Sequence, residues 1–135
     1  MGTLAAACAG ATGLSACAGV ATYRPTAPVL DGRVDVPRVE FDRLALDRGS
    51  IRVESPALPE PVNLIAIDGG FRAIGSTCTH QQCAVRPGGT FLRCGCHGST
   101  FDLAGEVVRG PAASPLSRYD VSSDAATIRI ATVPR

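Results

Sequence analysis

The chain has 135 residues, a length typical of one domain, which leaves no room for a second catalytic domain. Only 4% of the residues are aromatic, and 15 Gly and 10 Pro interrupt the chain, so a loop-rich β domain is favoured over a helix bundle. The formal net charge is +1, and the 13 basic residues, all of them Arg, are spread along the sequence instead of forming a run, which indicates no nucleic-acid-binding surface.

Residues 1–22 are expected to form an export signal or a lipoprotein-like segment. Residues 4–20 carry no charge and are mostly small and weakly apolar, so they lack the hydrophobic density of a membrane-spanning helix. The motif Leu-Ser-Ala-Cys that ends at Cys17 resembles a bacterial lipobox, in which Cys17 would be lipidated and would hold the protein at the membrane. Ordinary cleavage just after Cys17 is the alternative. Both outcomes predict a protein in the periplasm or on the outer face of the cytoplasmic membrane.

Residues 23–37 contain several Pro and Gly and little apolar periodicity, and we expect a tether that leads to a folded domain at residues 38–135. Within that domain, short runs with β-branched residues or partial alternation predict strands. The expected strands cover residues 36–46, 51–54, 62–67, 71–74, 90–93, 99–103, 106–108, 118–122 and 127–131. Residues 68–70 and 104–105 are expected hairpin turns. No stretch after residue 37 has a persuasive helical period, so the expected fold class is all-β, an antiparallel sandwich or small barrel.

Two short motifs of Cys and His each follow directly after a predicted strand. They are Cys78-Thr79-His80 and Cys94-Gly95-Cys96-His97. Four soft or borderline ligands on two loops that can face each other predict a metal site. Cys83 and Cys96 remain as a second pair at matching offsets and invite a disulfide between the loops.

These motifs lie in two longer segments, Cys78-Thr79-His80-Gln81-Gln82-Cys83 and Cys94-Gly95-Cys96-His97-Gly98-Ser99, which resemble the two cluster-binding boxes of Rieske iron-sulfur proteins. The resemblance extends over about residues 38–133. It implies a Rieske-type antiparallel β-sandwich or small barrel with a cluster-binding subdomain of two loops, and one [2Fe-2S] cluster. Cys78 and Cys94 would bind one iron, and His80 and His97 the other. Cys83 and Cys96 would form the disulfide of the high-potential branch.

The resemblance also assigns roles to residues around the cluster. Ser99 matches the serine that bonds a bridging sulfide, whereas Phe101 stands where high-potential members usually have a Tyr that bonds a ligand sulfur. The segment that begins with Gly110 and Pro111 resembles the proline loop that covers the cluster. Replacing two thiolates by imidazoles raises the potential to about −150 to +300 mV. Because one potential-raising hydrogen bond is missing, a positive but submaximal potential is expected.

Together these features predict a one-electron carrier outside the cytoplasm, which passes electrons between a quinol- or substrate-oxidising partner and a cytochrome or copper protein. The chain is not expected to be an enzyme by itself, because His80 and His97 are its only histidines and none remains for an acid-base catalyst or a mononuclear iron site. Redox proteins, and in one alternative quinol itself, are the expected partners.

Four alternatives stay open. The chain could be the Rieske subunit of a cytochrome bc complex, with His80 or His97 bonding quinol, but Gln81 is polar where such subunits usually have a bulky apolar residue. It could be the small subunit of an arsenite-oxidase-type molybdenum enzyme. It could be a ferredoxin of a ring-hydroxylating oxygenase, although those proteins generally lack the disulfide pair. A structural zinc module would use the same four ligands, but zinc does not account for Cys83, Cys96, Ser99 or the proline loop.

Overall fold

The computed structural model describes residues 19–45 and 49–135 of the chain. The candidate lipidation residue Cys17 therefore lies outside the described residues, as does most of the expected export segment. Within these two ranges, no helix has the length and the apolar character needed to cross a bilayer.

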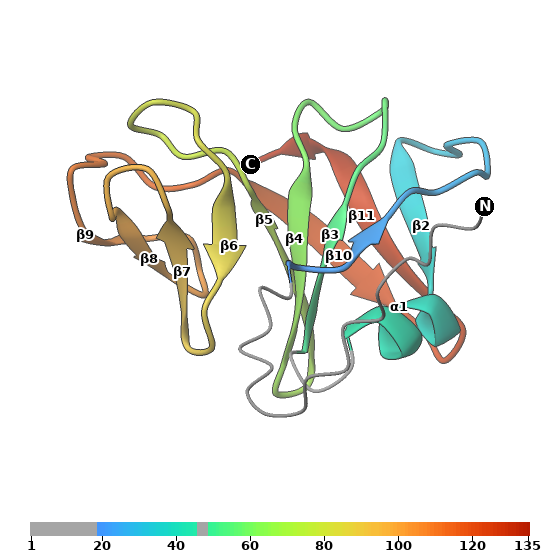
Figure 1. Cartoon of the computed structure of the whole chain (residues 1–135). Coiled ribbons are helices and arrows are strands. Elements are labelled where there is room, and N and C mark those ends of the chain that lie inside the picture. The colour runs from blue at the N-terminus through green and yellow to red at the C-terminus, as the bar shows by residue number, and fades with distance from the viewer. Residues whose placement is uncertain (1–18, 46–48) are drawn as a thin grey trace, which may run out of the picture.

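The larger part of the structure is a curled sheet of seven strands (Figure 1). Its strands, in the order in which they lie side by side, are β1 (Thr22–Tyr23), β3 (Ser50–Val53), β4 (Val62–Ile67), β5 (Gly70–Gly75), β10 (Arg118–Ser123), β11 (Thr127–Pro134) and β2 (Arg33–Pro37). The pair β1 and β3 is parallel, and all other neighbours are antiparallel. Alternate residues of these strands point to one side and form an aliphatic core that includes Ile51, Leu64, Ile128 and Ile130, all fully buried.

A smaller antiparallel sheet is inserted in the chain between β5 and β10. It consists of β6 (Val85–Pro87), β7 (Phe91–Cys94), β8 (Thr100–Asp102) and β9 (Val107–Arg109), in that order. Figure 1 shows it at one side of the molecule, beside β5. A second core cluster lies under this sheet and combines Leu92 and Phe101 with the thiols of Cys78 and Cys94. The four-stranded sheet is thus the part of the fold beside the two Cys-His motifs, and the all-β fold class is confirmed.

Both hairpin turns lie where the sequence predicts them. Ile67 pairs with Gly70 across the turn between β4 and β5, and Gly69 has a φ of 80°, a conformation that residues with a Cβ rarely adopt. Gly105 occupies the second turn, between β8 and β9.

The expected strand at residues 36–46 is wrong. The chain forms β2 up to Pro37 and then the helix α1 (Arg38–Ala45). Phe41 and Ala45 are buried, and Leu44 packs against the same core, so the apolar residues follow helical spacing. The β-branched Val36 and Val39 favoured a strand and masked this pattern in the sequence. β1 and β2 form the two edges of the seven-stranded sheet, so both ends of the segment expected as a tether, residues 23 and 33–37, lie in the folded sheet.

Strand β6 was also missed, because three residues that end in Pro carry little periodic signal. It is joined to the larger sheet by Asn63 in β4, whose buried Nδ2 donates a hydrogen bond to the carbonyl of Val85 at 3.1 Å. The backbone N–H of Val85 donates in turn to the carbonyl of Ser76 at 2.8 Å. A polar side chain buried between the sheets is thereby satisfied and sets their relative position.

Candidate metal centre

The two Cys-His motifs lie on the loops that connect β5 to β6 and β7 to β8, and the fold brings these loops together. Cys78 and Cys94 are free thiols, each only 1% exposed. His80 and His97 are exposed, with ring centroids 4.9 Å apart and an interplanar angle of 88°. The two predicted thiol ligands thus share one core cluster, and the two predicted imidazole ligands lie next to each other at the surface of the same two loops.

The two loops fold in the same way around their cysteines. In the first, the N–H of Cys78 donates to the carbonyl of Cys83 at 2.8 Å, and the N–H of Gln82 donates to the carbonyl of Cys78 at 2.9 Å. In the second, the N–H of Cys94 donates to the carbonyl of Ser99 at 2.9 Å, and the N–H of Gly98 donates to the carbonyl of Cys94 at 3.2 Å.

The fourth residue after each cysteine adopts a positive φ, 59° at Gln82 and 80° at Gly98. A glycine meets this requirement without strain in the second loop, whereas the first loop uses a residue with a Cβ. The same turn, made twice, presents two thiols from opposite loops.

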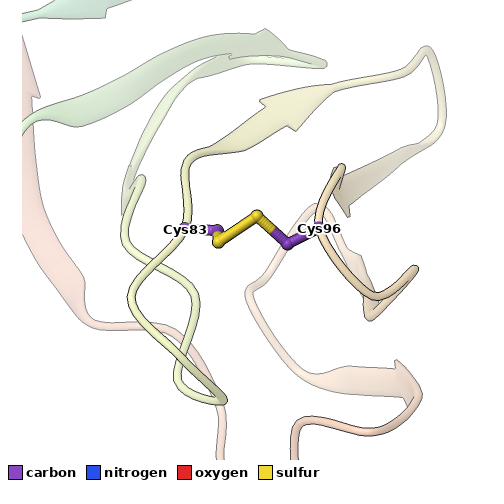
Figure 2. The surroundings of a disulfide bond; sticks show 2 residues. All are labelled: Cys83 and Cys96. Atoms are coloured by element: carbon purple, nitrogen blue, oxygen red, sulfur yellow. A yellow bond between two sulfur atoms is a disulfide. The ribbon is translucent and has the colours of Figure 1, made fainter.

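A disulfide between Cys83 and Cys96 joins the loops, as predicted (Figure 2). Its Cα atoms are 6.3 Å apart, within the usual range. The sulfur of Cys94 lies within 4.8 Å of both disulfide sulfurs. Because paired sulfurs are not thiolates, Cys94 is the member of this trio that can bind a metal.

The donors present fit a two-iron cluster with mixed ligands. Thiolates and imidazoles are the ligands of such clusters, two of each when the cluster is of the Rieske type. Here two thiols lie in the apolar interior and two imidazoles lie side by side at the surface, so the two halves of the donor set differ in both chemistry and exposure.

The proline loop, residues 110–115, is fastened to both cluster-binding loops. Ser99 is fully buried, and its Oγ accepts a hydrogen bond from the N–H of Ala112 at 3.0 Å. Thr79 Oγ1 donates to the carbonyl of Ser114 at 2.7 Å. Gly110 and Pro111 are exposed at the start of this loop. Ser99 accepts from the backbone, which leaves its own hydroxyl hydrogen free to donate elsewhere, as its expected role requires.

Phe101 is fully buried in the core cluster that also contains Cys78 and Cys94. The effect of Phe101 on the potential remains a prediction.

Glu60 is a residue of the site that the sequence did not indicate. One carboxylate oxygen accepts from the N–H of Thr77 at 3.0 Å, directly before Cys78, and the other accepts from the Tyr119 hydroxyl at 3.3 Å. Burial, and secondly the Glu60 charge, raise the pKa of Tyr119 to about 12. Glu60 and His80 line a common hollow of about 690 Å³. The only sequence signal was the rigid Pro-Glu-Pro segment before β4, which is too general to indicate a site.

Comparison with known proteins places the chain in a family. Residues 42–120 match the family model of the Rieske [2Fe-2S] domain. The cytochrome b6-f complex iron-sulfur subunit of Synechococcus sp. (strain JA-3-3Ab) is 33% identical over 91 residues, which cover 64% of this chain and 53% of that protein. The same subunit of Prochlorococcus marinus (strain AS9601) is 36% identical over 77 residues, which cover 52% and 43%. The chain thus spans about half the length of the curated relatives it matches.

Solved structures agree. The plasma membrane Rieske protein PetC3 of Synechocystis PCC 6803 superposes with a TM-score of 0.61 at 27% identity, over 72% of this chain and 97% of that one. A chain of the complex of reduced oxygenase and oxidized ferredoxin in carbazole 1,9a-dioxygenase superposes with a TM-score of 0.63 at 20% identity, over 77% and 96%, which speaks for the fold alone. The resemblance noted in the sequence is confirmed, and with it the cofactor, one [2Fe-2S] cluster. The chain belongs to the Rieske [2Fe-2S] domain family.

Proposed function

We propose that the chain is a one-electron carrier outside the cytoplasm, with Cys78 and Cys94 on one iron of its cluster and His80 and His97 on the other. The observation that carries this proposal is that two adjacent exposed imidazoles and two buried thiols come from the same pair of loops. An electron that enters or leaves through the imidazole side passes directly between the cluster and a partner at the surface. The fully buried side is closed by the core of the four-stranded sheet.

The cluster, when bound, accepts and releases one electron at the potential of a site with two imidazole ligands. The protein's own groups hold that site in place. The backbone turns fix the direction of each thiol, and the disulfide keeps the two loops at one separation. The hydrogen bonds from Ala112 to Ser99 and from Thr79 to Ser114 keep the proline loop over the loops and limit the access of water.

The proposed partners are a quinol- or substrate-oxidising protein as donor and a cytochrome or copper protein as acceptor. The relatives named as cytochrome b6-f subunits and as a plasma membrane Rieske protein support partners in a membrane-bound electron-transfer chain. Lipidation at Cys17 would hold the carrier near that membrane, in the periplasm or on the outer face of the cytoplasmic membrane.

A second candidate is a subunit of a cytochrome bc-type complex, which the 33% identity to b6-f subunits favours. In that function His80 or His97 would bond quinol directly. The exposed Gln81, which follows His80, is polar where an apolar quinol site would need an apolar contact. We therefore rank the independent carrier first.

The decisive experiment is an electron paramagnetic resonance spectrum of the purified protein, reduced first with ascorbate and then with dithionite. We expect a rhombic signal with an average g below that of all-thiolate ferredoxins, present already with ascorbate. A signal that needs dithionite would contradict the high-potential assignment, and a zinc-loaded protein without any signal would overturn the proposal. His80→Ala and His97→Ala should abolish the signal. Gln81→Ala, which changes the exposed residue next to His80 on the same loop, should keep it.

A further inference from the structure

Three arginines lie in one row across the four-stranded sheet. Arg86 in β6 is paired with Arg93 in β7, Arg93 with Thr100 in β8, and Thr100 with Arg109 in β9. Side chains directly opposite each other in antiparallel strands point to the same face. Arg86 and Arg93 therefore share one face, and Arg109 adjoins them at the register shift that β8 and β9 make between Thr100 and Phe101. We call Arg86, Arg93 and Arg109 the arginine row.

The arginine row faces the solvent. The strand neighbours Val85, Leu92 and Phe101 are fully buried and point into the core, so the residues next to them point outward. Arg86 and Arg93 are exposed accordingly, and Arg109 is exposed at the end of β9.

Among the residues that the structure describes, none of the three arginines forms an ion pair. The segment from residue 76 to residue 117 contains two acidic residues, Asp102 and Glu106. Glu106 is paired with Arg118, and Asp102 Oδ1 accepts from the backbone N–H groups of residues 104 and 106.

An acid that shares a hollow with Arg86 is also engaged. Glu54 lines a hollow together with Arg86, but it is bound by Arg24 at 2.7 Å and by Arg52 at 3.0 Å. Like charges directly opposite each other destabilise a sheet. The pairing of Arg86 with Arg93 therefore works against folding and points to a ligand of opposite charge.

The arginine row adjoins the cluster-binding loops. Arg86 and Arg93 line a hollow of about 410 Å³ together with Gly95 and the disulfide cysteine Cys96, which directly precedes His97. The loop residues 76–84 and 95–99 contain no Asp, Glu, Arg or Lys. The electrostatic field at this side of the proposed electron exit is thus set by the arginine row.

We propose that the arginine row docks an acidic patch on the redox partner protein and so guides that partner to His80 and His97. This inference rests on the proposed function for the identity of the partner. Complementary charge next to an electron exit raises the rate of encounter and selects the productive orientation.

A protein surface fits this face better than an anionic membrane does. Phe91, two residues before Arg93 on the same face, is 39% exposed, and aromatic residues and Arg are enriched together in protein interfaces.

The first test measures binding of fluorescein-labelled polyglutamate to the full chain by fluorescence anisotropy at low salt. Arg86→Gln, Arg93→Gln and Arg109→Gln together should weaken binding about tenfold, the combined effect of three exposed charge pairs. The matched control is Arg33→Gln, an exposed arginine without an ion pair in β2, at the opposite side of the molecule from β6 to β9 (Figure 1). Equal affinity of the triple variant and the wild type, or an equal loss in the control, would overturn the proposal.

A second variant separates docking from folding. Arg93→Glu places a negative charge directly across the strands from Arg86 and so replaces a repulsion by an attraction. The unfolding temperature should therefore stay the same or rise, while polyglutamate binding falls. A lower unfolding temperature together with the loss of binding would mean that the arginines serve the fold, and docking would be ruled out.

Two further measurements identify the partner class. Vesicles of phosphatidylglycerol should not bind in an arginine-dependent way. If they do bind in this way while polyglutamate does not, the surface is a membrane contact.

The second measurement compares the rates at which an anionic and a cationic oxidant oxidise the reduced cluster. The ratio of the rate with hexacyanoferrate(III) to the rate with tris(phenanthroline)cobalt(III) should be higher for the wild type than for the triple variant, and salt should remove this difference. Equal rate ratios for the wild type and the triple variant would count against guidance. If no cluster signal forms, the proposed function fails, whereas polyglutamate binding still tests the arginine row.

Discussion

The two sheets of this chain are stabilised in different ways. The seven-stranded sheet closes over a continuous aliphatic core, in which Ile51, Leu64 and Ile130 are fully buried. The four-stranded sheet has a smaller core whose members include the two buried free cysteines, Cys78 and Cys94, and it is tied by a disulfide and by backbone turns. The larger sheet is therefore a scaffold stabilised by burial of apolar side chains, whereas the smaller sheet depends on a disulfide and on hydrogen bonds that also shape the site.

The largest effect is expected from removing core volume in the scaffold. Leu64→Ala should lower the free energy of unfolding by about 3 kcal/mol, through lost burial and the cavity left behind. Urea denaturation measures this change. Ala66→Ser, at an exposed position in the same strand, is the control and should change the stability by less than about 0.5 kcal/mol. Equal losses in the two variants would refute the view that burial holds this sheet.

The disulfide should matter mainly to the smaller sheet. Cys83→Ser with Cys96→Ser removes a link between residues 13 apart in sequence, and a loop of about that size is worth about 3 kcal/mol. Because the link joins only the cluster-binding loops, amide hydrogen exchange should accelerate in β6 to β9 and change little in β4 and β11. The wild type treated with a disulfide reductant is the matched control. Uniform acceleration over both sheets would show that the two regions do not differ in the way argued above.

What the sequence could predict follows the same division. The two Cys-His segments could be predicted because Cys and His are metal ligands and their spacing is specific. The hairpin at Gly69 could be predicted from its turn residues. The helix at Arg38–Ala45 was missed because its buried positions, Phe41 and Ala45, are few and stand among β-branched neighbours.

Features that arise from pairing between distant segments could not be predicted. Glu60 contacts Thr77 and Tyr119 only after β4, β5 and β10 have come together. Arg86 and Arg93 were interpreted as part of a dispersed charge distribution, and only the strand register places them opposite each other. Local patterns contain no information on register, so a charged surface of this kind stays hidden until the sheet is known.

Tyr119 links the two sheets, and its ionisation makes the stability of the protein depend on pH. It is buried in the scaffold core, and its hydroxyl donates to Glu60, which holds the first cluster-binding loop through Thr77. Its pKa is raised from 10.0 to about 12, first by burial and then by the Glu60 charge. The folded state therefore keeps a proton that the unfolded state releases, so this stability is complete below pH 10 and falls as pH rises toward 12.

Tyr119→Phe should remove that decline, because Phe does not titrate. Urea denaturation of both proteins at several pH values between 9 and 11 measures the slopes. The same slope in the variant and the wild type would mean that Tyr119 is not the group responsible. Tyr23 is present in both proteins, so its own raised pKa cancels in the comparison.

The smallest expected effect concerns the reduction potential. It depends on the core of the smaller sheet, which contains the buried cysteines of the candidate site. Phe101 is fully buried with Cys78 and Cys94, so Phe101→Tyr places a hydroxyl where it can donate to a ligand sulfur and stabilise the reduced cluster. One such hydrogen bond corresponds to a rise of about 20–60 mV for a one-electron couple. A redox titration followed by electron paramagnetic resonance measures the shift, and Phe101→Leu, which changes packing without adding a donor, should not raise the potential. If Tyr left the potential unchanged or lowered it while the protein remained folded, the hydroxyl would not reach the sulfur, and the submaximal potential expected for this chain would need another cause.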